Sequence, residues 1–440
     1  MRIFLETGLA AVLIGAAAPC WSNAAGDDAD VPPAPTPVEV PQGPLPAETT
    51  APSGLSRWFN PATAPFIPVP LISTDPNSGS TFGLIPTWVQ TDDNHDVTRI
   101  IAPDILVNEN FGVGVHGRIF AYPSADEQWS VVAGIKERVE REVDFEYVSG
   151  LSRQGLWSIN YSLIYDRDGT PRYYGVGNDT PASAQSNYTN QQDFGRVQIG
   201  LNITHTWQLQ YTLQYQTVDV LPGTLDGVPS IQTLYPNVYG LGTNSQLLNR
   251  LAIVYDTRND QIIPTKGNMW VLYGGVAAKN GVFDESYSEY GVDGRGFWPV
   301  GPDTQVVAHM ALRYLPGSGQ VPFWGLSSIG GGESQIGGEQ PLRGFGAGRF
   351  YDRDSFSTSV ELRHRAFSFD AITTKLDIEV APFVDLGRVF GKTSTSPVDQ
   401  LHQVYGVGFR GIARPYVVGY VDVGHGSEGL AVFTGLNYPF

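Results

Sequence analysis

The sequence has 440 residues and a formal net charge of −17, and its single cysteine is Cys20. One cysteine excludes a disulfide framework and a metal site built from several thiolates. The acidic balance argues against a nucleic acid as the partner, because such partners require a basic surface. A chain of this length usually forms two or three soluble domains, but one closed transmembrane sheet can also take up all of it.

The N-terminus has the layout of a cleaved secretion signal. An apolar run covers residues 8–19 and follows Arg2, and Ser22–Ala24 offers small residues for cleavage. The run is shorter than the roughly 20 residues that a membrane-spanning helix needs. We therefore predict a signal peptide over residues 1–25. The alternative is a lipoprotein anchored through Cys20, which the preceding Pro19 disfavours.

A proline-rich segment follows this leader, with twelve prolines between residues 31 and 70. Proline has no N–H for a sheet and interrupts a helix. We therefore predict an extended periplasmic linker over residues 26–72. Two interpretations remain open for its more apolar end, residues 55–69: it rests against the mouth of the next domain, or it touches nothing.

After this linker, apolar and polar residues alternate in runs of about ten residues, a length that suits a tilted transmembrane strand. Residues 207–216 read Trp-Gln-Leu-Gln-Tyr-Thr-Leu-Gln-Tyr-Gln. Successive side chains of a strand point to opposite faces, so each run has one apolar face and one polar face. A soluble sandwich would alternate too. The run length, the Trp and Tyr at run ends and the polar second face favour a transmembrane barrel, which lipid requires to be closed.

The candidate strands number seventeen, whereas single-chain bacterial barrels have even strand numbers. We therefore predict an all-β, antiparallel transmembrane barrel of sixteen strands over residues 73–440, and the weakest candidates lie in 127–152. Long connections at 168–192, 219–245 and 315–353 are predicted to be extracellular loops. The candidate strands are residues 80–90, 97–107, 111–122, 127–138, 142–152, 155–167, 193–205, 207–218, 246–256, 268–278, 286–298, 304–314, 354–367, 374–389, 403–412, 414–423 and 430–440.

The connection 315–353 carries a motif that resembles a known family. Leu342-Arg343-Gly344-Phe345 is similar to the Arg-Gly-Phe/Tyr motif in the long sixth loop of the BamA/TamA superfamily of bacterial surface antigens. The segment from Phe383 to Gly387 resembles that family's Phe-x-Asp-x-Gly strand motif. Residues 256–267 resemble its Asp-x-Arg-Asn turn, and residues 173–178 a segment of its shorter members.

The resemblance implies a loop that folds back into the barrel, where its arginine meets acidic residues of the next two strands. Alternation places Glu361 and Asp385 on the polar, lumen-facing side of their predicted strands. A luminal Arg343 between two carboxylates would be held by charge-assisted hydrogen bonds. Gly344 would let the loop approach the wall closely. Together with Phe345 and Gly387 of the two motifs, these residues form a predicted structural latch; the alternative is an exposed glycine-rich loop.

The C-terminus resembles the β-signal by which barrel proteins are recognised for assembly. Tyr438 and Phe440 share one face of the predicted last strand, and Gly435 lies on the same strand. Two departures are Phe433, where a polar residue is usual, and Pro439, which cannot donate to a sheet ladder. In the family the seam between the first and last strands is a lateral gate. An ordinary closing strand is the alternative.

We predict no enzymatic activity and no cofactor. None of the seven histidines pairs at a metal-ligand spacing, and no nucleophile elbow or phosphate loop is present. The expected partners are outer-membrane lipid and lipopolysaccharide, the barrel-assembly machinery during biogenesis, and an unknown protein or lipid client. No partner is a nucleic acid.

Three functions fit these observations. The resemblance implies insertion or translocation of protein or lipid at the bacterial outer membrane. The segment between the predicted signal peptide and the first strand is expected to be too short for a POTRA domain, the module that collects clients in this family. A small-solute pore and a passive surface scaffold are the alternatives.

Overall fold

The computed structural model describes residues 66–440, except residues 93–96, 125, 262, 318, 372–373, 392–395, 414–416 and 437. The predicted signal peptide and most of the predicted linker lie outside these described residues. The described part contains no cysteine.

The described residues form strands almost throughout, with three short helical turns. The strands are β1 (Phe66–Asp75), β2 (Gly79–Thr91), β3 (Val97–Ile101), β4 (Asp104–Asn108), β5 (Gly112–Ser124), β6 (Glu127–Lys136), β7 (Arg141–Ser149), β8 (Trp157–Asp168), β9 (Arg172–Tyr173), β10 (Ser186–Asn202), β11 (Trp207–Pro222), β12 (Gly242–Asp256), β13 (Gly267–Ala277), β14 (Tyr287–Gly301), β15 (Thr304–Tyr314), β16 (Ser327–Ile329), β17 (Phe350–Asp352), β18 (Asp354–Ala371), β19 (Thr374–Phe390), β20 (His402–Ala413), β21 (Val417–Gly426) and β22 (Gly429–Leu436). The helical turns are η2 (Ala182–Ala184), α2 (Ile231–Leu234) and η3 (Phe323–Gly325).

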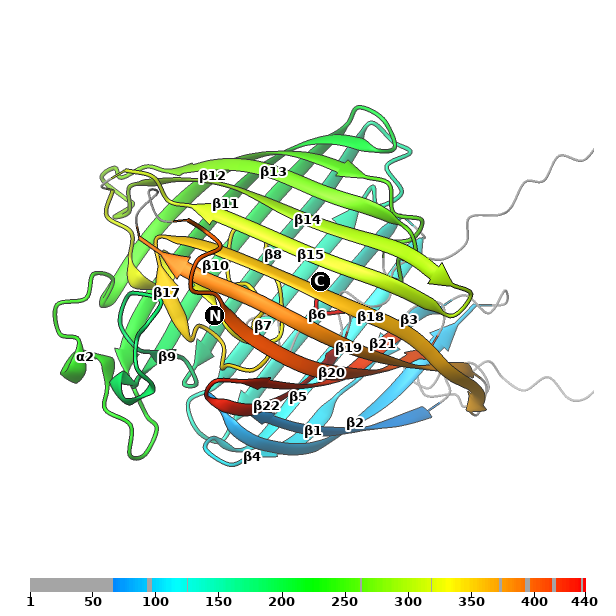
Figure 1. Cartoon of the computed structure of the whole chain (residues 1–440), viewed down its shortest axis with the longest axis horizontal. Helices are drawn as coiled ribbons and strands as arrows, with labels where there is room; N and C mark the ends of the chain where they lie inside the picture. The colour runs from blue at the N-terminus through cyan, green and yellow to red at the C-terminus, as the bar shows by residue number, and fades with distance from the viewer. Residues whose placement is uncertain are drawn as a thin grey trace, which may run out of the picture.

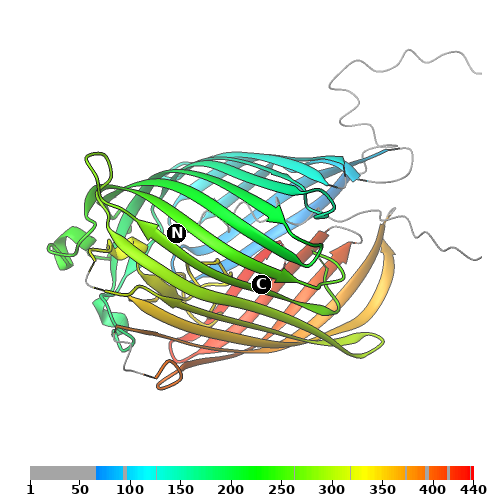
Figure 2. The same cartoon turned by 90° about the horizontal axis from the view of Figure 1, so that it is seen from above.

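The strands close into one antiparallel barrel, because each pairs with its neighbour and β1 pairs with β22 (Figures 1 and 2). Within the described ranges the barrel has 18 strands, since β3 and β4 are two parts of one interrupted strand and β9 only extends the sheet beside β10. All seventeen candidate runs coincide with barrel strands. The predicted count of sixteen is wrong, because the strand that makes the number even is β1, which begins at Phe66 inside the predicted linker.

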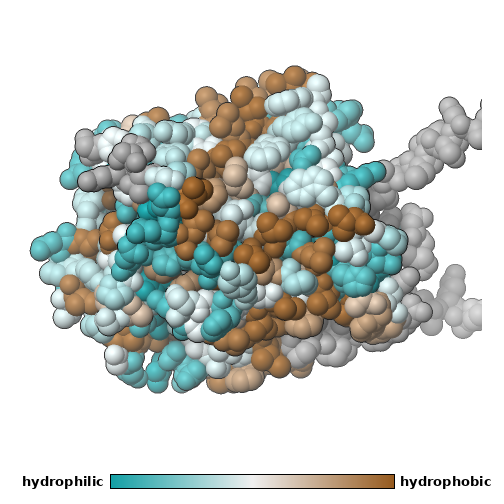
Figure 3. Space-filling model, in the orientation of Figure 1, coloured by the Kyte–Doolittle hydropathy of each residue, from teal (hydrophilic) through white to brown (hydrophobic). Residues whose placement is uncertain are grey.

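The two faces of the wall follow the alternation of the sequence. Trp157, Leu163 and Ile253 are exposed on the outside, whereas Gln208 and Gln216 are buried toward the lumen. Apolar residues form bands over the outer surface in Figure 3. An apolar exterior around a polar interior is the pattern of a barrel whose surrounding medium is lipid.

The connections differ between the two ends of the barrel. The long ones lie together at one end, where Figure 1 shows α2 and β9, and they include residues 169–185, 223–241 and 315–353. The other end carries shorter turns, such as residues 302–303 between β14 and β15. This asymmetry assigns the end with long loops to the cell exterior and the other end to the periplasm.

None of the helical segments in the described part of the chain is long and apolar enough to cross a membrane.

Prolines explain why the wall is irregular near β1. Pro68 lies directly opposite Pro86 in an unbroken β1–β2 ladder. Opposite residues in an antiparallel ladder exchange either two N–H bonds or none, and proline has none to give. The nitrogens of these two prolines therefore point away from each other. Pro86 turns toward the gap between β3 and β4, where Pro103 also lacks an N–H, and the strand breaks there.

The same geometry leaves the β1–β22 seam weakly paired. The nitrogens of Pro68 and Pro70 point to the edge of β1 that faces β22, because residues two apart point the same way. Among the described residues, Thr74 opposite Val432 is the only pair that joins the two strands. Asp75 ends β1 at the exterior turn, so the seam is closed at its outer end and unpaired toward the periplasm.

Restoring backbone N–H donors on the β1 edge should lengthen the paired part of the seam. We expect the double variant Pro68→Thr/Pro70→Thr to slow hydrogen exchange at Phe433–Leu436 of β22, because each new hydrogen bond contributes about 1 kcal/mol. Mass spectrometry of the refolded barrel measures this exchange. The matched control is Pro86→Thr, whose nitrogen faces the other way. Equal exchange at the seam in all three proteins would contradict the assignment.

Candidate functional site

The connection between β15 and β18, residues 315–353, folds into the barrel. Within it β16 and β17 pair as a small antiparallel sheet separate from the wall. Leu342, Arg343 and Phe345 lie on the segment between them and are almost fully buried. This inner loop therefore fills part of the lumen instead of projecting into solvent.

Arg343 shares its guanidinium among three carboxylates. Its Nε and Nη2 donate to the two oxygens of Asp385 at 2.9 and 2.7 Å, a bidentate pair. Its Nη1 donates to Glu361 at 2.5 Å and to Asp422 at 2.9 Å. The backbone N–H of Arg343 also donates to Asp385, at 3.1 Å. Charge-assisted hydrogen bonds are the strong ones, so main chain and side chain both fix this loop residue to the wall.

The carboxylates come from β18, β19 and β21, and two more arginines complete the cluster. Arg363 Nε donates to Glu361 at 2.7 Å. Arg410 pairs with Asp422 and lies 3.3 Å from Glu361. We call Arg343, Glu361, Arg363, Asp385, Arg410 and Asp422 the latch cluster. All six are buried, and three positive charges balance three negative ones. Such burial is tolerable because each charge meets opposite partners.

Apolar contacts support the latch cluster. The carbon at the centre of the Arg343 guanidinium lies 3.5 Å from the centre of the Phe383 ring, a cation–π contact. Phe345 packs in an apolar cluster that joins the inner loop to the wall. Besides Phe345, that cluster contains Ile329, Leu342, Phe350, Phe383, Val389 and Val404.

Two glycines of the predicted latch lie where the inner loop approaches the wall closely. A Cβ on Gly344 would lie 2.6 Å from the backbone nitrogen of Gly426, so a larger residue would push the loop away. A Cβ on Gly387 would lie 3.3 Å from Ile329 of the inner loop. The structure thus brings the six residues of the predicted latch, Arg343, Gly344, Phe345, Glu361, Asp385 and Gly387, to one place.

The sequence reasoning did not include Asp422 or Arg410 in the site. Both lie in candidate strands, and each is a charged residue next to an outward-facing aromatic or aliphatic one, Phe409 or Val421. Alternation therefore could have placed them in the lumen. Arg363 lies two residues after Glu361, so alternation places it on the same luminal face. Which luminal charges meet depends on strand stagger, which one sequence does not reveal.

The C-terminus differs from the predicted strand over residues 430–440. β22 ends at Leu436, and Tyr438 and Phe440 lie inside the barrel. Tyr438 lies beneath the Arg363 guanidinium at 3.7 Å, and Phe440 stacks on His309 with ring centres 5.0 Å apart. Pro439 cannot continue the ladder, and the aromatic rings instead pack beside the latch cluster. On β22 itself, a Cβ on Gly435 would lie 2.7 Å from the Tyr420 ring. The assembly-signal role of Gly435, Tyr438 and Phe440 stays a prediction.

The inner loop also contacts both sides of the seam. The Asn77 amide, in the turn after β1, donates to the carbonyl of Ala347 at 2.8 Å. Arg349 pairs with Glu428, in the turn before β22, with Nε to carboxylate distances of 2.8 and 2.9 Å. We call these two contacts the seam staple. Because they tie one loop to the first and the last strand, they hold the outer end of the seam together.

Removing the central charge of the latch should destabilise the barrel. We expect Arg343→Ala to lower its unfolding free energy by roughly 3–5 kcal/mol, because three carboxylates would keep their burial but lose their shared partner. The temperature at which the folded band disappears on a semi-native gel reports this loss. Arg196→Ala, which breaks a partly exposed luminal pair with Glu146, is the matched control. An Arg343→Ala barrel as heat-resistant as the control would contradict a latch.

Comparisons with known proteins agree with this architecture. The Omp85 superfamily domain matches residues 127–412, more than half of the chain. Among solved structures, the chain is similar to BamA from Haemophilus ducreyi lacking POTRA domains 1-3, with 14% identity and a TM-score of 0.50 over 87% of this chain and 76% of that one. It is also similar to CdiB from Escherichia coli, with 11% identity and a TM-score of 0.51 over 85% of this chain and 67% of that one. A search of curated protein sequences finds no match.

Structural likeness at these identities establishes a shared fold and nothing finer. The domain match covers the wall from β6 to β20, including the inner loop and most of the latch cluster. An apolar outer surface, a closed antiparallel wall and a loop held inside the lumen accompany that match. The chain therefore belongs to the Omp85 superfamily and is an integral β-barrel of the bacterial outer membrane.

Proposed function

We propose that this barrel assists the insertion of a protein or lipid client into the outer membrane by opening its wall between β1 and β22. The observation that supports the proposal is the seam. All of β1 pairs with β2, but Thr74 opposite Val432 is its one pair with β22 among the described residues. Every other junction of neighbouring strands in the described wall has a ladder of several pairs, even where β3 and β4 interrupt it, so the seam is where the wall can part.

In lipid, an open seam would expose two strand edges that need hydrogen-bond partners. Backbone N–H and C=O groups in hydrocarbon must find partners, and an unpaired strand edge is a template for an added strand. Pro68 and Pro70 remove two donors from the edge of β1. The β22 edge keeps the N–H groups of Thr434 and Leu436, which point the same way as that of Val432. A client strand is therefore expected to pair with β22 more completely than with β1.

The seam staple supports control of this opening. Asn77 and Glu428 lie on the first and last hairpins, and both bind the inner loop. The latch cluster anchors the same loop to β18, β19 and β21. Parting the seam at its outer end therefore requires the loop to release at least one hairpin. A solute pore or a passive scaffold needs no such coupling.

Locking the seam should abolish the activity. Thr74→Cys and Val432→Cys place thiols on directly opposite residues, at a spacing that suits a disulfide. We expect a strain that relies on the oxidised protein to show the outer-membrane protein and lipid defects of a deletion strain, with recovery after reduction. The readouts are the outer-membrane proteome and lipid composition.

The matched control for this lock is Ile253→Cys/Leu272→Cys, which cross-links the fully paired β12–β13 ladder on the lipid-facing side. It should leave the proteome and lipid composition unchanged. Full activity of the Thr74–Val432 lock would rule out the seam as the route. A deletion strain with a normal membrane would favour the pore or scaffold.

Weakening the seam staple should make the seam open too readily. Arg349→Ala removes the pair with Glu428 and leaves the latch cluster intact, so we expect cells to admit large antibiotics such as vancomycin at several-fold lower concentrations. Sensitivity assays measure this. Arg353→Ala, which removes bonds to carbonyls at the end of the same loop, is the control. If both variants sensitise cells equally, general loosening of the loop explains the effect and the staple does not.

A further inference from the structure

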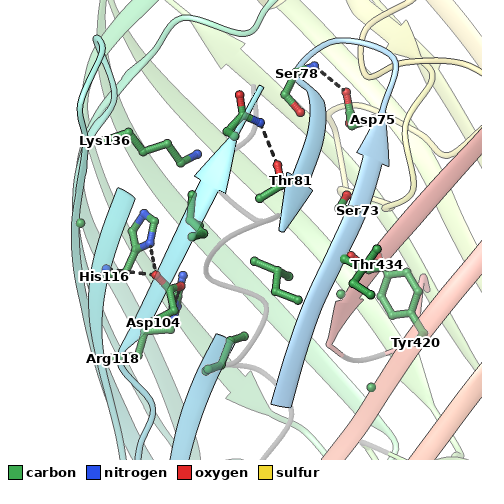
Figure 4. A pocket seen from close by; sticks show the side chains of 18 of the residues that line it. Ser73, Asp75, Ser78, Thr81, Asp104, His116, Arg118, Lys136, Tyr420 and Thr434 are labelled. Atoms are coloured by element: carbon green, nitrogen blue, oxygen red, sulfur yellow. Dashed lines mark hydrogen bonds and ion pairs between the residues drawn. The ribbon is translucent and has the colours of Figure 1, made fainter. Parts of the chain in front are cut away.

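A cavity of about 560 Å³ lies inside the barrel next to the unpaired part of the seam. Its lining includes Ser73 of β1 and Thr434 and Gly435 of β22, which follow the single Thr74–Val432 pair along the two strands. Figure 4 shows Ser73 and Thr434 on facing strands at one side of the cavity. The cavity also touches Ile72, an exposed residue of the lipid-facing surface. It therefore lies on the luminal side of the seam.

One part of this cavity is apolar. Leu71, Ile85 and Leu106 line it from the lumen side. Below them, Ile85 packs with buried Ile100 and Phe120 in a cluster that also includes Leu71. The lumen of an outer-membrane barrel is normally polar. An apolar strip on this inner wall, beside the seam with its missing ladder pairs, suits a hydrocarbon chain and does not suit water.

The opposite part of the cavity is charged. Asp104 accepts a hydrogen bond from Arg118 and lies 2.7 Å from the His116 ring nitrogen (Figure 4). Lys136 pairs with Glu140. The lining as a whole contains six carboxylates and four cationic side chains. The carboxylates are Asp75, Asp104, Glu140, Glu142, Asp166 and Asp168, and the cations are Arg118, Lys136, Arg141 and Arg410.

We propose that this cavity binds a membrane phospholipid with an amine-bearing head. The acyl chain lies along Leu71, Ile85 and Leu106 and reaches the bilayer through the unpaired seam, and the head lies among the charged residues. The volume falls within the range of small-molecule pockets, roughly 300–1,000 Å³. The surplus of carboxylates favours an ammonium over a head whose only charge is a phosphate.

The inference goes beyond the proposed function, because it concerns a small molecule held inside the wall and requires no client. A polypeptide segment is a poorer occupant. A peptide would bring backbone N–H and C=O groups against Leu71, Ile85 and Leu106, which offer no hydrogen bonds, and such groups are costly to leave unpaired. An acyl chain has none.

Site-specific photo-cross-linking tests the proposal on the full-length barrel in nanodiscs. A benzophenone amino acid replaces Leu106 inside the cavity, Val107 on the lipid-facing surface, or Thr212 on the far luminal wall. With phosphatidylethanolamine nanodiscs, we expect lipid adducts at Leu106 and at Val107, and at least a ten-fold lower yield at Thr212. Mass spectrometry of the intact protein counts the adducts.

Two comparisons decide the outcome. Adducts at Val107 with none at Leu106 would overturn the lipid site, because the probe would work and the cavity would hold no lipid. Equal adducts at Leu106 from phosphatidylglycerol would overturn the amine-bearing head. Heat-modifiability on a semi-native gel shows for each variant separately that the barrel has folded, so a negative result at Leu106 cannot reflect misfolding.

A second variant tests the route of entry. Ile72→Cys/Thr434→Cys continues the register of Thr74–Val432 by two residues and would close the seam beside the cavity. We expect oxidation to lower the Leu106 adduct several-fold and reduction to restore it, with the Val107 adduct unchanged. An undiminished Leu106 adduct would overturn entry through the seam. This assay needs no client, so its failure is distinguishable from failure of the insertion proposal.

Discussion

Hydrocarbon offers no hydrogen-bond partners, so every backbone donor and acceptor of a membrane-spanning wall must be paired within the protein. This constraint explains why the strands of the wall form one closed sheet and why its edges meet. It also makes each missing ladder pair energetically costly, so the places where pairs are missing point to function. In this barrel the imperfections are concentrated near one place. The interruption between β3 and β4 and the missing β1–β22 pairs both lie beside prolines.

The inner loop also balances the charges of the buried latch cluster. A single arginine brought into the lumen meets three carboxylates from three strands. Without it the remaining charges of the latch cluster would be two positive and three negative. The wall strands therefore carry one excess negative charge where the loop contacts them, and Arg343 of the loop neutralises it. A buried charge network fixes position more than it adds stability, because desolvation offsets most of its attraction.

Much of this architecture follows from periodicity. The alternation from residue 80 onward predicts seventeen real strands, and it orients Glu361 and Asp385 toward the lumen. β1 escaped prediction because its first half, Phe66–Pro70, reads as proline-rich linker. A proline can occupy an edge strand when its nitrogen faces away from the paired neighbour, and only the pairing partners show which way it faces. The predicted extension of the last strand to residue 440 is wrong for a related reason. Whether Tyr438 and Phe440 face lipid or turn inward depends on their contacts with the latch cluster and its neighbours, which the sequence does not reveal.

The seam, the staple and the latch form one mechanical path. The latch cluster holds the inner loop to β18, β19 and β21, and the staple holds the same loop to the hairpins on either side of the seam. The loop contacts therefore join β1 and β22 in addition to the single Thr74–Val432 pair. Closure at the outer end thus rests on side-chain contacts of the inner loop as well as on one backbone pair. The strands next to the seam, β2 and β21, are held to β1 and β22 by long ladders.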